Sequence, residues 1–154
     1  AGELGIEFPH RLEANHVINV KKQCLVTSVG YFGKVSLDAR YTNQHDLKYQ
    51  DALGNALLQH ARVVPGGILV FFPSYGLMDK MHDRWEVTGL LQALQEIKGV
   101  YLEPRGQGKI DGVLAQYYVS VASLSENQSS KENQYYSSTR TGAMMLAVAR
   151  GKVS

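Results

Sequence analysis

GGILVFFPSYGLMDKMHDRW, from Gly66 to Trp85, places a short apolar run directly before a helical pattern. The run Ile68–Phe72 is too short for a buried helix and is rich in branched and aromatic residues, so it predicts a strand that is buried on both faces. Ser74 is a residue type that favours a helix N-cap. The helix that follows is expected to end near Thr88, with an apolar face made by Leu77, Met78, Met81 and Trp85.

Helical and strand-like patterns alternate on both sides of this stretch. The Pro-Gly-Gly sequence that begins at Pro65 is expected to end the preceding helix. The predicted elements, besides the strand and helix above, are helices over Asp46–Val64, Leu90–Ile97 and Lys109–Ala122, and strands over Gly99–Leu102 and Ala143–Ala149. Such alternation is typical of an α/β domain with a mostly parallel sheet flanked by helices.

Three further features are less regular. The segments His16–Val20 and Gln23–Val29 are predicted as two strands that could form a hairpin. His60 falls on the apolar stripe of its helix and is expected to be a hydrogen-bonded core residue. Ser123–Thr141 is rich in Ser, Asn and Gln and is predicted to be a disordered surface insertion. That insertion is either a tolerated loop or a regulatory segment with serines that can be phosphorylated.

Composition limits the classes of protein to which the chain can belong. Its 154 residues are enough for one domain with a sizeable core. A net charge of +2 does not by itself indicate a nucleic-acid partner. Cys24 is the single cysteine, which excludes an internal disulfide and favours a reducing compartment. No run approaches the roughly 20 apolar residues of a membrane helix, and no membrane partner is expected.

Three loops are expected to follow the carboxyl ends of parallel strands, where ligands of α/β sheets gather. Ser74 and Tyr75 follow the first strand, and a helix N-terminus there suits a phosphate while an aromatic ring suits a base. Arg105 and Lys109 lie in a Gly-rich loop after the second strand. Arg150–Lys152 follow the last strand. These loops are candidates for a phosphate-binding surface.

Structural interpretations compete with each of these candidate sites. Ser74 can simply cap its helix, and Tyr75 can simply pack. The Gly-rich loop can be an ordinary turn, and the basic residues near the end can be a solvated tail. The sequence contains no HExxH, no GxSxG and no phosphate loop of the GxxxxGK[ST] type, so no catalytic and no metal-binding residues are predicted.

Four stretches occur in the order found in a known family. They are ELGIEFPHRLEANHVI (Glu3–Ile18), GGILVFFPSYGLMDKMHDRW, YLEPRGQG (Tyr101–Gly108) and AMMLAVARGKVS (Ala143–Ser154). The sequence resembles the second motor domain of the iron–sulfur DNA helicases of superfamily 2, the xeroderma pigmentosum group D type. VFFPSY matches motif IV, and ARGKVS matches the first half of motif V. Within the family, LEANHVI favours the Fanconi anaemia group J branch over the telomere-regulating branch.

The resemblance implies that residues 1–154 are part of a RecA-like second motor domain. The intact parent would be an ATP-dependent DNA helicase that moves 5′ to 3′ on single-stranded DNA and acts in DNA repair in the nucleus. The parent would use ATP and Mg²⁺ and carry an iron–sulfur cluster that this chain does not bind. The partners would be single-stranded DNA and the first motor domain. The missing initiating Met and the interrupted motif V predict a fragment without ATP hydrolysis of its own.

The resemblance also implies roles for individual residues. The residues expected to contact DNA are Ser74, Tyr75, Arg105, Arg150 and Lys152, and those expected near the nucleotide are Gly151 and Ser154. Two alternatives remain open. The chain could be a free-standing α/β module that binds single-stranded nucleic acid without ATP, or a structural remnant that binds nothing.

Overall fold

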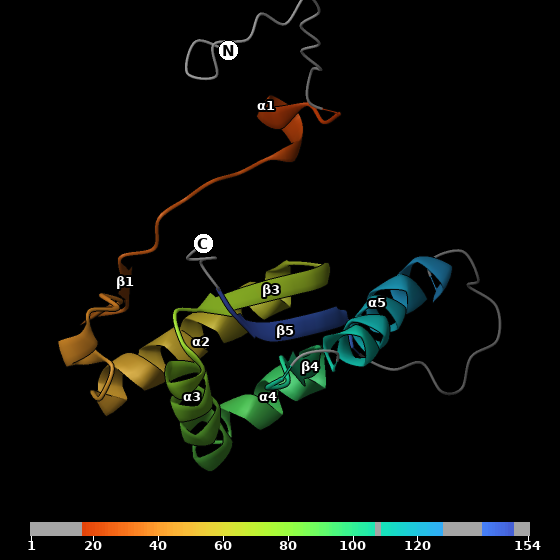
Figure 1. The fold of residues 1–154 in the computed structure, drawn as a ribbon. Helices are drawn as coiled ribbons and strands as arrows, with labels where there is room; N and C mark the ends of the chain where they lie inside the picture. Colours follow the sequence, from red (N-terminus) through yellow and green to blue (C-terminus); the bar gives the residue numbers. More distant parts are fainter. Residues whose placement is uncertain (1–16, 107–108, 128–139, 150–154) are drawn as a thin grey trace, which may run out of the picture.

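A computed structural model describes residues 17–106, 109–127 and 140–149 of the chain. Figure 1 shows helices arranged around a small sheet, with the segment before β1 extending away from them. In chain order the elements are α1 (Val20–Gln23), β1 (Tyr31–Phe32), β2 (Val35–Ser36), a 3₁₀ turn (Tyr41–Asn43), α2 (Leu47–Val63), β3 (Gly66–Phe72), α3 (Tyr75–Val87), α4 (Leu90–Ile97), β4 (Gly99–Leu102), α5 (Ile110–Asn127) and β5 (Gly142–Val148).

The main sheet has three parallel strands in the order β3–β5–β4. Central β5 places Met144 and Leu146 against α2, α3 and α4, whereas Ala143, Met145 and Ala147 face α5. Alternate side chains of a strand point to opposite faces, so two apolar layers form around one buried strand. The predicted α/β class with a parallel sheet between helices is therefore confirmed.

The larger apolar layer is centred on Trp85, whose side chain is fully buried. Its indole Nε1 donates a hydrogen bond of 2.8 Å to the Gln50 carbonyl of α2. Gly54 of α2 lies so close to this indole that a Cβ there would sit 2.8 Å from its Cδ1 atom. The apolar face predicted for α3 is thus the face that joins α3 to α2, and Ser74 caps this helix as expected.

A buried lysine holds the amino edge of the sheet together. The Lys98 side chain is 0% exposed, and its ammonium donates to the carbonyls of Val64 at 2.6 Å, Thr141 at 2.8 Å and Gly66 at 3.1 Å. These acceptors lie at the end of α2, before β5 and at the start of β3. Burial lowers the pKa of this ammonium below its usual value.

The prediction that the strand at Ile68–Phe72 is buried on both faces was wrong. The burial of β3 alternates along the strand, and Leu69 and Phe71 are 52% and 61% exposed. The reason is that α5 covers β5 and reaches only the start of β3, where Tyr117 and Val121 lie against Gly67, so the same face of β3 is left open at Leu69 and Phe71 within the described residues. His60 was also expected in the core, yet it is exposed, with its Nδ1 2.7 Å from the Ala56 carbonyl.

The predicted strands near the amino terminus were wrong as well. Residues 20–23 form the short helix α1, and residues 24–30 have no regular structure, while His16 lies outside the described residues. The hairpin is instead formed by β1 and β2. Gly33 adopts a φ of 60° in its two-residue turn, a conformation that glycine accepts without strain. Among the residues that the structure describes, the apolar residues of the earlier segment pair with no strand.

The remaining boundaries agree with the sequence to within a few residues, except at the proposed insertion. Helix α5 runs to Asn127, so the first residues of Ser123–Thr141 are helical. At the other end of the proposed insertion, the Arg140 side chain donates to the Gln95 carbonyl at 2.7 Å, and the Thr141 amide donates to the Ile97 carbonyl at 2.7 Å. Residues 128–139 lie outside the described residues, and their disorder stays a prediction. In the part that the structure describes, no helix is long and apolar enough to cross a membrane.

Candidate nucleic-acid interface

The carboxyl ends of the three parallel strands meet at one edge of the sheet. Beyond the strands, the Ala149 amide donates to the Phe72 carbonyl and the Glu103 amide donates to the Leu146 carbonyl, both at 2.8 Å. These bonds hold the first residues of the three loops close together. The loops that carry Ser74, Tyr75 and Arg105 therefore leave the sheet at one edge.

Ser74 acts first as a helix cap. Its Oγ accepts a hydrogen bond from the Leu77 amide at 3.2 Å, which satisfies one of the amides at the start of α3. The residue is exposed, as are Pro73 and Gly76 beside it. Ser74 thus caps its helix, as one of the two interpretations predicted. The exposed helix N-terminus leaves room for an additional polar partner.

Tyr75 is joined to the two other strand ends through one carboxylate. Its hydroxyl donates to Glu103 Oε1 at 2.8 Å, and Glu103 Oε2 accepts from the Val148 amide at 2.7 Å. Glu103 is only 8% exposed. A buried carboxylate is stable when hydrogen-bond donors surround it, and here the donors come from α3 and β5.

Arg105 lies over the ring of Tyr75. Its guanidinium carbon is 5.4 Å from the ring centroid, within the range of a cation–π contact. The same guanidinium forms an ion pair with Asp79, one helical turn beyond Tyr75 on α3. The Arg105 side chain remains 67% exposed, so solvent reaches the cation. A phosphate at this edge would share Arg105 with the Asp79 carboxylate.

The structure brings together three of the predicted site residues and leaves four untested. Ser74, Tyr75 and Arg105 converge at the carboxyl edge, and Lys109 is exposed just before α5. The other four, Arg150, Gly151, Lys152 and Ser154, lie outside the described residues.

Sequence reasoning missed the contacts of Asp79 and Glu103. Neither residue was among the predicted site residues. Tyr75 and Asp79 are four residues apart on one helix, and that spacing was a signal that both side chains face the same loop. No comparable spacing links Tyr75 to Glu103, because they are 28 residues apart and come together through the crossover between β3 and β4.

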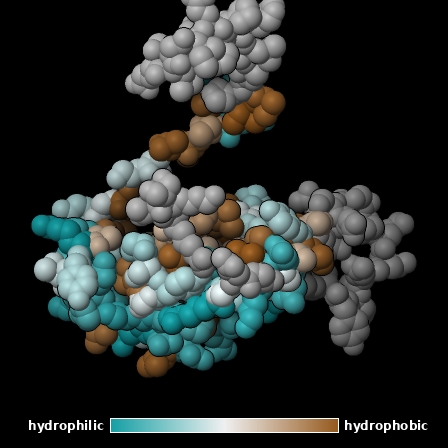
Figure 2. Space-filling view, viewed as in Figure 1, coloured by the Kyte–Doolittle hydropathy of each residue, from teal (hydrophilic) through white to brown (hydrophobic). Residues whose placement is uncertain are grey.

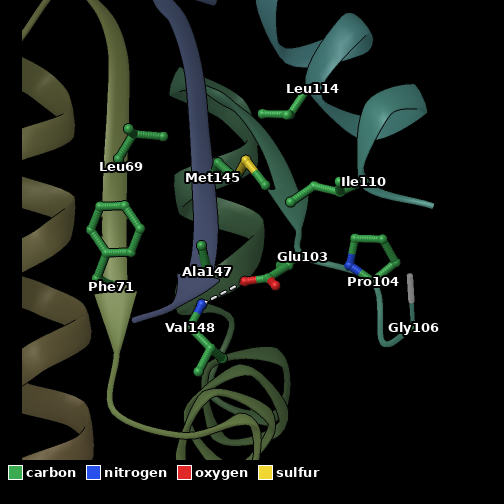
Figure 3. A pocket seen from close by; sticks show the side chains of 10 residues that line it. All are labelled: Leu69, Phe71, Glu103, Pro104, Gly106, Ile110, Leu114, Met145, Ala147 and Val148. Atoms are coloured by element: carbon green, nitrogen blue, oxygen red, sulfur yellow. Dashed lines mark hydrogen bonds between the residues drawn. The ribbon is translucent and has the colours of Figure 1, made fainter. Parts of the chain in front are cut away.

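An apolar pocket of about 500 Å³ lies beside this polar cluster. Figure 3 shows Leu69 and Phe71 on β3, Ile110 and Leu114 on α5, and the Glu103–Val148 hydrogen bond near Pro104. Figure 2 shows apolar surface exposed among hydrophilic residues on the face of the molecule that is drawn there. The pocket follows from the open face of β3.

One grouping in the described part of the chain has the residue types of a metal site. His82, Asp83 and Glu86 lie within one turn of α3, with ligand atoms within 4.8 Å of one another. Asp83 and Glu86 are exposed, and the His82 Nδ1 atom is 3.6 Å from an Asp83 oxygen. Neighbouring polar residues on a solvated helix surface commonly group in this way, so the grouping supports no assignment.

Comparison with known proteins identifies the family. Residues 57–154 match the helicase C-terminal domain. The mouse regulator of telomere elongation helicase 1 is 40% identical over 154 residues, covering 99% of this chain and 12% of the relative. The chicken Fanconi anemia group J protein homolog is 38% identical over 157 residues, covering 100% of this chain and 11% of the relative. An Aedes aegypti homolog of the telomere helicase is 34% identical over 152 residues, covering 99% of this chain and 14% of the relative.

Relatives of both branches match at similar identity, so the preference for the group J branch stays a prediction. The chain spans between 11% and 14% of the length of these three relatives. The match to the family domain covers more than half of the chain, and the parallel α/β fold agrees with it. The chain therefore belongs to the helicase C-terminal domain family, in agreement with its resemblance to superfamily 2 helicases of the xeroderma pigmentosum group D type.

Proposed function

We propose that this chain is part of the second motor domain of an ATP-dependent DNA helicase and that the carboxyl edge of its sheet holds the backbone of single-stranded DNA. The observation that carries the proposal is the convergence of Ser74, Tyr75 and Arg105 at that edge. Helix N-termini, exposed guanidinium groups and aromatic rings are the groups that bind phosphates and bases. Membership of the helicase family supplies the second line of support.

Each residue has a distinct part in this proposal. Arg105 offers an exposed cation to a phosphate, and the start of α3 beside Ser74 offers backbone amides. The Tyr75 ring packs against the Arg105 guanidinium, and a base can stack on the plane of that guanidinium. Arg150 and Lys152, which follow β5 in the sequence, would add cations to the same edge, and Gly151 and Ser154 would lie toward the nucleotide.

The proposal extends to the parent protein. ATP and Mg²⁺ would bind between this domain and the first motor domain, and cycles of binding and hydrolysis would move the domain 5′ to 3′ along the strand. The parent would carry an iron–sulfur cluster outside this chain and act in DNA repair in the nucleus. The relatives named for telomere regulation and for Fanconi anemia support the setting.

The direct test replaces the two principal cations in the intact helicase. Arg105→Ala and Lys152→Ala are each expected to weaken binding of single-stranded DNA whatever its sequence. Each is also expected to reduce the log–log salt dependence of the binding constant by about 0.7, the value for one lost phosphate contact. Fluorescence anisotropy with labelled oligonucleotides over a range of salt concentrations measures both effects.

The matched control is Arg62→Ala, an exposed arginine near the end of α2, just before β3 begins. That position lies at the amino edge of the sheet, so affinity and salt slope should stay at the wild-type values. Unchanged affinity and salt slope in the double variant of Arg105 and Lys152 would refute the proposed DNA contact.

The isolated 154-residue chain is expected to hydrolyse no ATP, with or without DNA. The sequence contains no phosphate loop of the GxxxxGK[ST] type, whose amides and lysine hold the transferred phosphate in this class of enzyme. A phosphate-release assay on chain freed of other ATPases measures the turnover. Turnover stimulated by DNA in that preparation would contradict the assignment of this chain as a partial motor domain.

A further inference from the structure

Glu103 occupies a special place at the carboxyl edge because it contacts two of the three converging segments through one carboxylate. It lies directly after β4, and its two oxygens accept from the Tyr75 hydroxyl on α3 and from the Val148 amide at the end of β5. Its own amide is bonded to the Leu146 carbonyl. The side chain is almost fully buried, so these bonds are shielded from competition with water.

We propose that Glu103 is a positioning residue for single-strand binding. Its carboxylate sets the orientation of the Tyr75 ring beneath Arg105 and holds the Tyr75 hydroxyl close to the end of β5 at Val148. This inference rests on the proposed function, since it assigns Glu103 a role within that site.

The hydrogen bonds of Glu103 determine which substitution breaks the bridge. An O–H donor and an N–H donor converge on the same side chain, and an ionised carboxylate accepts from both. Glutamine could keep both contacts, because its oxygen can accept from the Val148 amide while its NH₂ group donates to the Tyr75 hydroxyl oxygen. Leucine is of similar size and has no acceptor, so Glu103→Leu removes both hydrogen bonds and lets Tyr75 and the end of β5 move.

The sign of the expected effect separates positioning from simple charge. A carboxylate near a phosphate-binding edge repels the DNA backbone, so its neutralisation should strengthen binding if charge were its only influence. A positioning role predicts the opposite result, because loss of the bridge misplaces the Tyr75 ring and the Arg105 guanidinium above it. A purely structural role would change the melting temperature and leave the affinity of the folded protein unaltered.

The experiment uses Glu103→Leu in the intact helicase, with binding of a fluorescent oligothymidylate measured well below the melting temperature. The dissociation constant is expected to rise about tenfold or more, the size of effect for the loss of one hydrogen bond to a charged group. An unchanged or lower dissociation constant would overturn the inference. Arg105→Ala, measured alongside, tests the site itself. If Arg105→Ala weakens binding and Glu103→Leu does not, only the inference fails, and if neither weakens it, the proposed function fails too.

Asp79→Asn is the matched control, because it removes the same charge at the same edge but leaves the Tyr75–Glu103–Val148 bridge in place. It frees Arg105 from a competing carboxylate, so binding should be at least as tight as in the wild type. Tyr75→Phe removes only the hydroxyl and tests the link from its other end. It should weaken binding, and Glu103→Leu should then have a smaller effect than in the wild-type background. Equal effects of Glu103→Leu in both backgrounds would also overturn the inference.

Discussion

Replacing Lys98 by Met is expected to lower the free energy of unfolding of the domain by about 3 kcal/mol, because three backbone carbonyls lose a charged donor. Met has a similar length and fills the same space, so the loss reports the ammonium rather than a cavity. The three carbonyls, from Val64, Gly66 and Thr141, belong to segments that meet at the amino edge of the sheet. Urea unfolding followed by circular dichroism measures the change.

Lys48→Met provides the control, because Lys48 is an exposed lysine at the start of α2. Its replacement should change the stability by less than about 0.5 kcal/mol, as is usual for a surface position. A similarly small change for Lys98→Met would show that the buried ammonium contributes nothing to the fold.

The pH dependence of stability, compared between the wild type and Lys98→Met, gives a second measure of the role of Lys98. Burial lowers the pKa of Lys98 in the folded protein below the usual 10.5, so the unfolded chain keeps this proton at pH values where the folded chain begins to release it. The stability that this titration contributes is fully present above the pKa of Lys98 in the unfolded chain. It is lost as the pH falls through the pKa of Lys98 in the folded protein. The difference in unfolding free energy between wild type and Lys98→Met should therefore grow as the pH rises toward 10.5.

Local patterns predicted most of the sheet and its helices because they depend on near neighbours in the chain. The apolar spacing of α2 and α3, the Ser74 cap and the apolar run of β5 each carry their own signal, and all of them formed as expected. The strand predicted over Gln23–Val29 has a suitable composition, yet a strand also needs a partner. Val26 in that segment is 88% exposed, so composition alone was misleading.

The parts that the sequence could not predict depend on contacts between distant segments. An apolar run cannot show that α5 covers β5 and β4 but leaves Phe71 on β3 exposed. The candidate site divides in the same way. The rule that ligands gather at the carboxyl ends of parallel strands placed Tyr75 and Arg105 at one edge. The link between Tyr75 and Glu103, by contrast, exists only because the crossover returns β4 to the far side of β5.

Replacing Gly142 by Ala is expected to destabilise the domain by about 3 kcal/mol or more, through backbone strain together with overlap. Gly142 begins β5 with a φ of 129°, which residues with a side chain rarely adopt. It is paired in register with Gly66, and a Cβ at Gly142 would overlap the backbone oxygen of Gly66. Backbone atoms cannot move away as easily as a flexible side chain can. The pairing of β3 with β5 must therefore open at its first residue pair, Gly66 and Gly142. Thermal and urea unfolding measure the loss.

Gly112→Ala in α5 is the control, because the same chemical change there should have the opposite sign. A Cβ at Gly112 meets nothing within 4 Å, and alanine favours a helix more than glycine does, so this variant should be more stable by about 0.5–1 kcal/mol. A Gly142→Ala protein as stable as the wild type would show that the register of β5 is not fixed at its start. That register also sets where β5 ends, since a slip would carry the Val148 amide away from Glu103. Loss of stability at Gly142 should therefore be accompanied by weaker single-strand binding in the intact helicase, although Gly142 and its partner Gly66 lie at the opposite edge of the sheet from the proposed DNA contact.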